Sequence, residues 1–306
     1  MDKFYADTVR LLLTVAPDVF ANDIFAMKGG TAINLLVRDM PRLSVDIDVV
    51  YLQWQTPRDE ALQAINQELA AIATRVAPLG VQTRLIRAKD LGDTKLIVEN
   101  EASQVKIEVN VVFRGHVLPI ERRRLSTRTS DLFGVEFELP ILSLDELYAS
   151  KLVAALDRQH PRDLFDVWQL YASGGISDGM VECFVIYLAG HNRPPHEVLF
   201  CSDKDIAGEY ERAFVGMTEV DCSLDTLLQV RSQLKDELPR RLTTAHKQFL
   251  RGLVRAEPDW SLVQCQHAAQ LPALRWKLNN LEAFRKRRPE SFAAQAAALD
   301  AGLDQS

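Results

Sequence analysis

The chain has 306 residues, of which 47% are hydrophobic and 25% charged, and a formal net charge of −6. This composition excludes a disordered chain and is sufficient to bury a large core, most simply in two domains. No apolar stretch reaches the roughly 18 residues of a membrane helix, so we expect no membrane span, no export signal and a cytoplasmic protein. The four cysteines show no Cys-x-x-Cys spacing, which indicates neither a zinc site nor a disulfide framework.

Hydrophobic periodicity predicts a mixed α/β region followed by a helical one. Helices are predicted over residues 3–16, 30–39, 57–77, 143–158 and 161–172, and strands over residues 45–52, 81–88, 95–100, 105–113 and 135–141. After Ser173-Gly174-Gly175, which is typical of a break, the pattern is almost wholly helical. We therefore expect an α+β fold, with a mixed-sheet domain over residues 1–173 and a mainly helical C-terminal domain over residues 174–306.

Two acids lie two residues apart on one predicted strand. Asp46 and Asp48 alternate there with Val45, Ile47 and Val49. Because side chains alternate along a strand, both carboxylates point to one face and the apolar residues to the core. Neighbouring acids repel each other unless a cation lies between them, and Mg²⁺, which binds carboxylates and substrate phosphates, is the expected one.

A glycine pair, Gly29-Gly30, precedes this strand and leads into a predicted helix. Glycines let the backbone approach a triphosphate closely, and the N-terminus of a helix favours anions. Each pattern alone is weak, since glycine pairs are usually turns and Asp-x-Asp pairs are usually solvated. In this order, however, they resemble the signature of the polymerase β-like nucleotidyltransferases: a glycine pair, a helix, and two acids on a strand.

The strand predicted at 105–113 offers a third acid. Glu108 shares a face with Lys106 and Asn110. In two-metal phosphoryl chemistry a third carboxylate commonly helps to hold the metal that activates the attacking hydroxyl, which makes Glu108 a candidate metal ligand. The alternative is a half-exposed strand whose outer face is polar.

A lysine lies in an unusual position further along the chain. Ser143 and Glu146 have the spacing of a capping box, which predicts that a helix begins there. Lys151 falls on the apolar stripe of this helix. It either snorkels to the surface or supplies a positive charge to a phosphate.

Two more acids follow on the next predicted helix. Pro161 suits its first turn, and Asp163 and Asp166 lie three residues apart on one side. They are candidate catalytic residues. The structural alternative is that Asp163 stabilises the helix N-terminus while Asp166 pairs with Arg162.

Together these segments resemble the four successive motifs of the AbiEii/AbiGii toxin nucleotidyltransferases, which include the MenT-like toxins. The residues that carry the resemblance are Gly29-Gly30-Thr31-Ala32, Arg42-Leu-Ser44-Val-Asp46-Ile-Asp48, Lys106-Ile-Glu108, Lys151 and Arg162-Asp163-Leu-Phe-Asp166. The resemblance implies that Asp46 and Asp48 bind Mg²⁺, with Glu108 as a positional match for a third ligand, and that Lys151, Asp163 and Asp166 act in catalysis. It also implies nucleotide binding by Gly29, Gly30, Thr31, Arg42, Ser44 and Lys151.

Charge is unevenly distributed along the chain. From Arg231 to Arg288 there are 13 Lys and Arg against 5 Asp and Glu, a balance of +8 that leaves −14 for the rest. A basic C-terminal region favours a polyanion such as RNA, and ordinary solvated helices are the alternative. A second cluster, Arg122, Arg123, Arg124 and Arg128, is expected to line a site or to keep a polar loop soluble.

We therefore expect a Mg²⁺-dependent enzyme that moves a nucleoside monophosphate from an NTP to an acceptor hydroxyl. By resemblance the acceptor is the 3′ end of tRNA, its modification halts translation, and the protein is the toxin of a toxin–antitoxin or phage-defence (abortive infection) pair with an AbiEi-like antitoxin. Two other classes stay open: transfer to a protein or small molecule, and a non-catalytic binding module whose acids form an ion-pair network.

Overall fold

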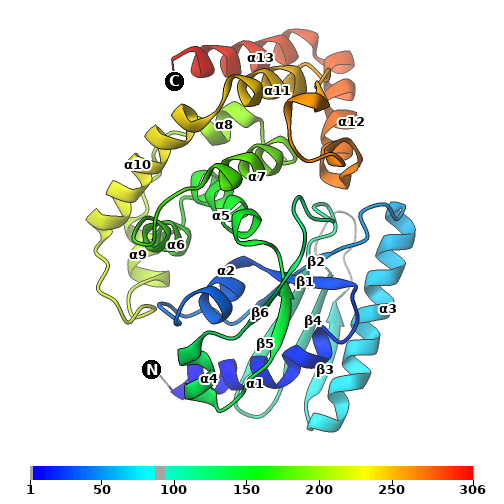
Figure 1. The fold of residues 1–306 in the computed structure, drawn as a ribbon, viewed down its shortest axis with the longest axis vertical. Coiled ribbons are helices and arrows are strands. Elements are labelled where there is room, and N and C mark those ends of the chain that lie inside the picture. Colours follow the sequence, from blue (N-terminus) through cyan, green and yellow to red (C-terminus); the bar gives the residue numbers. More distant parts are fainter. Residues whose placement is uncertain (1–2, 87–93, 306) are drawn as a thin grey trace. The chain divides into compact units, whose positions relative to one another are not determined.

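The chain forms two compact units in the computed structural model, which describes residues 3–86 and 94–305 (Figure 1). The sheet unit comprises Met1–Ser143 with Thr218–Val220, and the helical unit comprises Leu144–Met217 with Asp221–Ser306. The domain boundary that we expect at residue 173 separates functional domains rather than compact units, and it stays a prediction.

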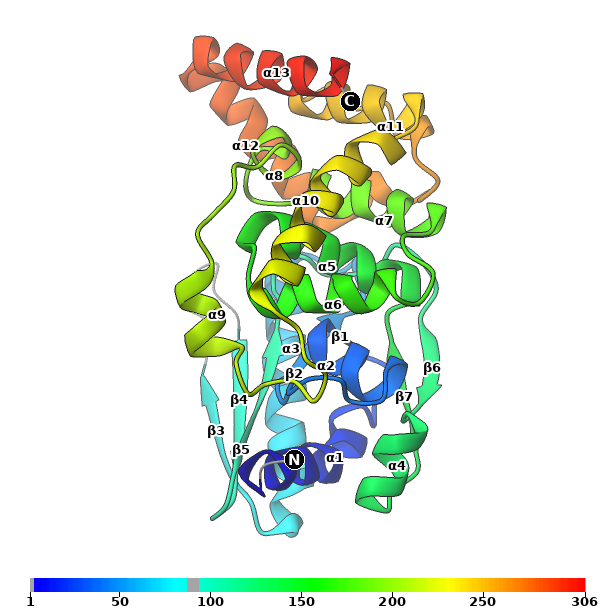
Figure 2. The same ribbon diagram turned by 90° about the vertical axis from the view of Figure 1, so that its left-hand side faces the viewer.

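In the part of the sheet unit that the structure describes, one seven-stranded mixed sheet has the order β3-β4-β5-β2-β1-β7-β6 (Figure 2). Its strands are β1 (Phe25–Lys28), β2 (Ile47–Tyr51), β3 (Gln82–Ile86), β4 (Thr94–Glu99), β5 (Gln104–Val109), β6 (Glu121–Arg124) and β7 (Glu138–Ile141). Strand β2 is parallel to β5 and β1 is parallel to β7, while the other neighbours are antiparallel. The expected mixed sheet is confirmed.

Two long helices cover one face of this sheet. Helix α1 (Lys3–Val19) packs against β5, and α3 (Arg58–Val76) packs against β3 and β4. Their apolar stripes, which include Leu12 and Leu69, are fully buried. In β5 and over Ile47–Val49 of β2, every second residue is buried in this core and the intervening residues form the opposite face.

Three segments differ from the sequence-based expectation. The apolar strand β1 was missed because four residues are too short for a clear period. The arginine cluster does not form a loop: Arg122–Arg124 lies within β6, an edge strand held by its pairing with β7, and Arg128 lies within a helix that was not predicted, α4 (Thr127–Phe133). The helix expected at 30–39 is a short α-helix, α2 (Gly29–Ala32), followed by a π-helical turn, η1 (Ile33–Val37). Of the strand expected at 81–88, residues 87 and 88 lie outside the described residues.

Over its described residues, up to residue 305, the helical unit contains nine α-helices. They are α5 (Leu144–Arg158), α6 (Pro161–Tyr171), α7 (Asp178–Ala189), α8 (Pro195–Leu199), α9 (Ala207–Ala213), α10 (Leu224–Arg241), α11 (Thr244–Val254), α12 (Pro272–Arg287) and α13 (Pro289–Asp304). Helix α5 packs against both α6 and α7, and nearly every residue of α7 is buried. In the described part of the chain, no helix has the length and apolar character to cross a membrane.

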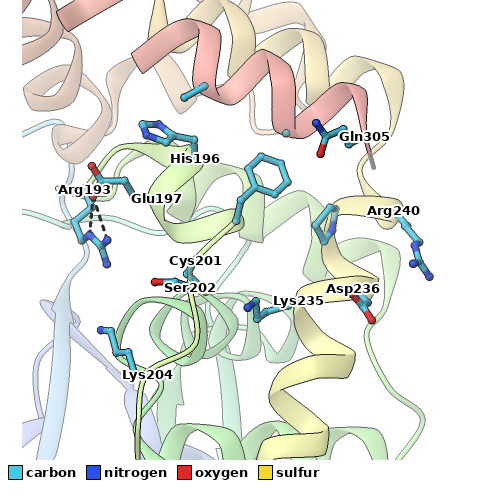
Figure 3. Close-up of a pocket in the computed structure, with 14 residues that line it drawn as sticks. Arg193, His196, Glu197, Cys201, Ser202, Lys204, Lys235, Asp236, Arg240 and Gln305 are labelled. Carbon is cyan, nitrogen blue, oxygen red and sulfur yellow. Dashed lines mark hydrogen bonds and ion pairs between the residues drawn. The ribbon is translucent and has the colours of Figure 1, made fainter. Parts of the chain in front are cut away.

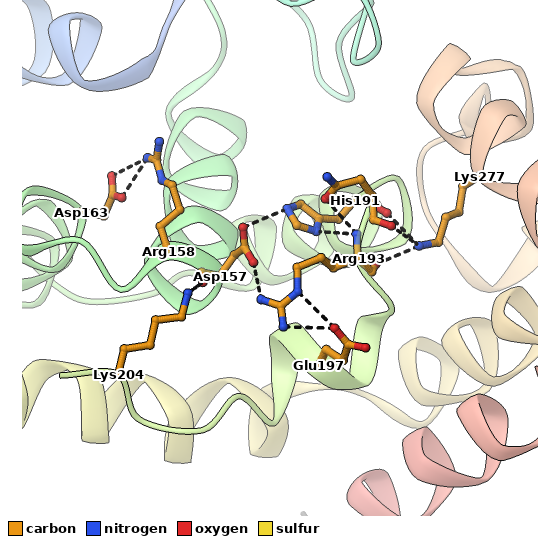
Figure 4. Close-up of polar contacts among 9 residues, drawn as sticks. Asp157, Arg158, Asp163, His191, Arg193, Glu197, Lys204 and Lys277 are labelled. Carbon is orange, nitrogen blue, oxygen red and sulfur yellow. Dashed lines mark hydrogen bonds and ion pairs between the residues drawn. The ribbon is translucent and has the colours of Figure 1, made fainter. Parts of the chain in front are cut away.

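Several helix ends of this unit are fixed by side chains. Ser177 and Ser223 accept hydrogen bonds from the first turns of α7 and α10. Thr243 and His246 form a capping box at the start of α11. Lys277 of α12 is buried, and its Nζ donates to the carbonyls of His191 and Arg193, each at 2.8 Å. These contacts tie the loop after α7 to α12 (Figure 4).

Candidate functional site

The two predicted acids lie on the face of the sheet opposite α1 and α3. Asp48 is within β2, and Asp46 directly precedes this strand. Ile47 and Val49 are fully buried in the core, whereas the Asp46 side chain is 48% exposed and Asp48 is half-buried. The alternation expected from the sequence therefore places the two carboxylates on the polar face.

Strand register assembles a row of charges around Asp48. Asp48 is paired with Lys28 of β1 on one side and with Glu108 of β5 on the other, and Glu108 is paired with Lys95 of β4. Residues opposite each other on paired strands point to the same face. All four are half-buried. Four strands thus contribute one charged residue each to a single row.

The glycine pair lies against the acidic strand. Gly29 has φ of 78°, a conformation that favours glycine. A Cβ atom at Gly29 would overlap Oδ2 of Asp48 and lie 3.1 Å from its Cβ and Cγ. The absence of a side chain at Gly29 is therefore what allows the Asp48 carboxylate to lie against the backbone.

The remaining predicted nucleotide-binding residues surround Gly30. A Cβ atom at Gly30 would overlap Nη2 of Arg42 and lie 3.2 Å from Oγ of Ser44. The hydroxyl groups of Thr31 and Ser44 are hydrogen-bonded to each other at 2.8 Å. Arg42 is only 4% exposed, and its backbone N–H donates to Asn34. The structure thus brings Gly29, Gly30, Thr31, Arg42 and Ser44 together around the turn that faces Asp48.

Glu108 is engaged by a neighbouring strand. Its Oε1 lies 2.9 Å from Nζ of Lys95, and Nζ of Lys106 lies 4.0 Å from Oδ1 of Asp46. These lysines neutralise part of the acidic face. Glu108 is the direct neighbour of Asp48, as a third ligand should be, but it is also half of an ordinary cross-strand ion pair. Its role as a metal ligand stays a prediction.

The three candidates of the helical unit form one buried ion cluster. Nζ of Lys151 lies 2.9 Å from Oδ1 of Asp163 and 2.9 Å from Oδ2 of Asp166. Lys151 is 8% exposed, so it does not snorkel to the surface, and Asp166 pairs with Lys151 rather than with Arg162. Arg158, at the end of α5, reaches Oδ2 of Asp163 at 2.8 Å (Figure 4). The cluster therefore holds two cations and two carboxylates.

Sequence reasoning missed the partners of the predicted residues. Arg158 was not assigned a role, although it follows Lys151 by seven residues and so shares its helix face. Lys95 and Lys28 gave no local signal, because only the strand register places them beside Glu108 and Asp48. Helical spacing could have identified Arg158; the lysines required the tertiary structure.

The donor atoms of the polar face suit Mg²⁺. Carboxylate oxygens are the hard ligands that this ion prefers, and Gly29 provides the space that the Asp48 carboxylate occupies. Over residues 3–86 and 94–305, no group of three or more His, Cys, Asp or Glu side chains is gathered closely enough to hold a metal ion by itself. Asp46 and Asp48 could supply two ligands, and substrate phosphates and water the others, which is the usual arrangement for Mg²⁺.

A separate cavity of about 580 Å³ lies within the helical unit (Figure 3). It is lined by α8, the segment after it, α10 and α13, with Phe200, Lys235 and Arg240 among its walls. Burial lowers the pKa of His196 and raises that of Cys201, both in its lining. All of its lining residues differ from those predicted to form the site, and its charges are mixed.

A polar network lies beside this cavity (Figure 4). Arg193 pairs with Asp157 at 2.6 Å and with Glu197 at 3.1 Å. The hydrogen bond to Asp157 raises the pKa of Arg193. These contacts link α5 to α8 and are explained by the packing of the helical unit.

A glycine turn packed against Asp48, with Asp46 on the same face of a mixed sheet, is the arrangement expected of the nucleotidyltransferase class. The model of the AbiEii nucleotidyl transferase toxin family, of type IV toxin–antitoxin systems, matches residues 10–280. The chain belongs to this family and is a nucleotidyltransferase, as its motifs predicted. Membership implies an NTP substrate and an antitoxin partner.

Comparison with solved structures supports the same fold. The chain is similar to MenT4, a nucleotidyltransferase toxin from Mycobacterium tuberculosis H37Rv, with a TM-score of 0.61 and 15% sequence identity over 92% of this chain and 95% of that one. At this identity the likeness shows the fold alone. It confirms the expected α+β architecture of a nucleotidyltransferase domain with a helical C-terminal part. No curated protein matches the sequence.

Proposed function

We propose that this toxin uses Mg²⁺ to transfer a nucleoside monophosphate from an NTP to the 3′ end of tRNA. The observation that carries the proposal is the placement of Asp48 directly against Gly29, with Asp46 on the same face. A triphosphate approaching the glycine turn would meet both carboxylates, which is where a metal must bridge protein and phosphate.

The residues of the sheet unit would bind and orient the nucleotide. Asp46 and Asp48 would hold Mg²⁺, which when bound orients the triphosphate and neutralises its charge. The paired hydroxyls of Thr31 and Ser44 can donate to phosphate oxygens. Arg42, packed on Gly30, fixes the turn and adds positive charge. The acceptor oxygen then forms its bond to the α-phosphorus in line as the bond to pyrophosphate breaks.

Lys151, Asp163 and Asp166 are assigned to the same reaction. Lys151 supplies a point charge to phosphate, and the two aspartates fix the direction of its ammonium from two sides. Arg158 also pairs with Asp163, so that carboxylate is shared between two cations and neutralises the Lys151 charge only in part.

The charge of the helical unit supports an RNA acceptor. Part of the basic excess is neutralised by acids outside that region, since Asp300 pairs with both Arg251 and Arg255. The remaining charge is concentrated at the end of α12, where Lys286, Arg287 and Arg288 are exposed and, among the described residues, without an ion-pair partner. We call Lys286, Arg287 and Arg288 the basic cluster and propose that it contacts RNA phosphates.

Membership of the family supports a proposal about the biological setting. We propose that tRNA modification in the cytoplasm halts translation, that the system acts in phage defence, and that an AbiEi-like antitoxin controls it. Transfer to a protein or small molecule, and binding without catalysis, become outcomes of the test below.

The test is pyrophosphate release from each of the four NTPs, with and without purified tRNA, in Mg²⁺ and in EDTA. Asp46→Ala is the active-site variant. Asp59→Ala is its matched control, since Asp59 lies in the same unit and its side chain is 97% exposed. We expect release that needs tRNA, Mg²⁺ and Asp46. Release independent of tRNA would favour a different acceptor, and no release under any condition would favour a binding module.

A further inference from the structure

Lys28 is the last residue of β1 and comes immediately before the glycine pair. Its side chain is half-buried. Within residues 3–86 and 94–305, the ammonium group makes neither a hydrogen bond nor an ion pair. Partial burial removes water from a cation, and an acid or a bound anion normally replaces it.

The other lysines of the same polar face are paired. Lys95 lies 2.9 Å from Glu108, and Lys106 lies 4.0 Å from Asp46. Lys28 stands directly opposite Asp48 in the strand register, yet it forms no ion pair with it. Among the described residues, Lys28 is therefore the lysine of this row whose charge is available to a ligand.

The backbone at Lys28 brings this charge to the glycine turn. Lys28 is extended, with φ of −139° and ψ of −174°, and the chain then turns through Gly29 at φ of 78°. Because Asp48 packs against Gly29, Lys28, the turn and the carboxylate belong to one small surface. A ligand with several negative charges could contact a metal on Asp48 and the Lys28 ammonium at once.

We propose that Lys28 binds the triphosphate of the NTP. The inference rests on the proposed function and names a further residue of the same site. A lysine ammonium is a compact point charge with three donors, which suits phosphate oxygens of varied position. The alternative role of Lys28 is that of a counter-ion for Asp48 in the metal-free protein. This role predicts a different result in the binding experiment.

Equilibrium binding separates these roles without turnover. The dissociation constants of each NTP and of the matching nucleoside are measured by calorimetry in Mg²⁺, together with that of Mg²⁺ alone. The variants are Lys28→Met, Lys28→Gln and Lys28→Arg. Arg84→Met is the matched control, because Arg84 is an exposed cation on β3 of the same sheet. Thermal unfolding checks that each variant is folded. If either Lys28→Met or Lys28→Gln does not fold, the other neutral variant is used in its place.

We expect Lys28→Met to weaken NTP binding about tenfold or more, as for loss of a charge-assisted hydrogen bond. Lys28→Arg should retain most of the affinity, and Arg84→Met all of it. Nucleoside binding should not change. Wild-type NTP affinity in both neutral variants overturns the proposal, as does tighter Mg²⁺ binding with unchanged NTP affinity. A wild-type protein that binds no NTP contradicts the proposed function itself and removes this inference with it.

Discussion

The close contact between Gly29 and Asp48 can be tested by one methyl group. Gly29→Ala introduces a Cβ that overlaps Oδ2 of Asp48 and lies 3.1 Å from its Cβ and Cγ. It also places a non-glycine residue at φ of 78°. The second effect can be measured separately in Gly80→Ala, because Gly80 has φ of 75° and no atom of the described residues within 4 Å of its Cβ position.

Both substitutions incur the free-energy cost of a left-handed conformation, and only Gly29→Ala incurs a second cost at Asp48. A left-handed conformation costs a non-glycine residue about 1–2 kcal/mol. This applies at both positions. Gly29→Ala must also displace the Asp48 carboxylate from its rotamer, which adds about 1 kcal/mol. We therefore expect Gly80→Ala to lose about 1 kcal/mol of unfolding free energy, and Gly29→Ala about 2 kcal/mol.

Activity should separate the variants much more than stability does. A carboxylate displaced by about 1 Å lowers the transfer rate about 100-fold. Gly80→Ala should keep the wild-type rate. Urea unfolding and pyrophosphate release on the same preparations provide both numbers. If Gly29→Ala is fully active, or if Gly80→Ala loses activity equally, the assignment of the Gly29–Asp48 contact to the reaction is wrong.

Four further outcomes are expected. Asp46→Ala should abolish growth inhibition while thermal stability without Mg²⁺ stays within about 0.5 kcal/mol of wild type, because its pairing is exposed and weak; full toxicity would remove the metal assignment. Lys151→Met should cost about 3–5 kcal/mol in urea unfolding by leaving buried carboxylates unpaired. Adding Asp166→Asn should restore stability but not activity, and recovered activity would give Lys151 a purely structural role. Burial lowers the pKa of Lys277 to about 8 from 10.5, so the unfolded chain binds this proton more tightly. The free energy of unfolding should therefore rise by about 3 kcal/mol between pH 8 and pH 10.5, relative to that of Lys277→Met. If the free energies of the two proteins change in parallel with pH, this prediction is contradicted. Ser44→Asp should weaken NTP binding in calorimetry by adding negative charge that repels the triphosphate, and unchanged NTP affinity would place Ser44 away from the phosphates.

Local patterns predicted the acidic strand and the glycine turn. Alternation alone was enough to place Asp46 and Asp48 on one face, because a buried strand leaves every second residue on the other side. The conformation of Gly29 was likewise foreseeable, since only glycine adopts its φ without strain. These features depend on a few consecutive residues, which is why the sequence contains them.

Features that depend on register or on packing between helices were not predictable in the same way. β6 consists of Glu121 and three arginines, a composition with low strand propensity, and it exists because β7 pairs with it. The burial of Lys151 could not be distinguished from snorkelling until its two carboxylate partners on α6 were located. The charge that Asp300 neutralises in the basic region could not be predicted, because Asp300 lies outside that region of the sequence.

The central claim is tested most directly by following the α-phosphate. Purified protein is incubated with α-³²P-labelled NTPs, Mg²⁺ and tRNA, and a parallel sample contains tRNA whose 3′ ribose has been oxidised by periodate. We predict that label enters intact tRNA, is absent from oxidised tRNA, and is lost in Asp46→Ala but not in Asp59→Ala. Equal labelling of intact and oxidised tRNA, or labelling that survives Asp46→Ala, would contradict transfer to the 3′ hydroxyl at the Asp46–Asp48 site.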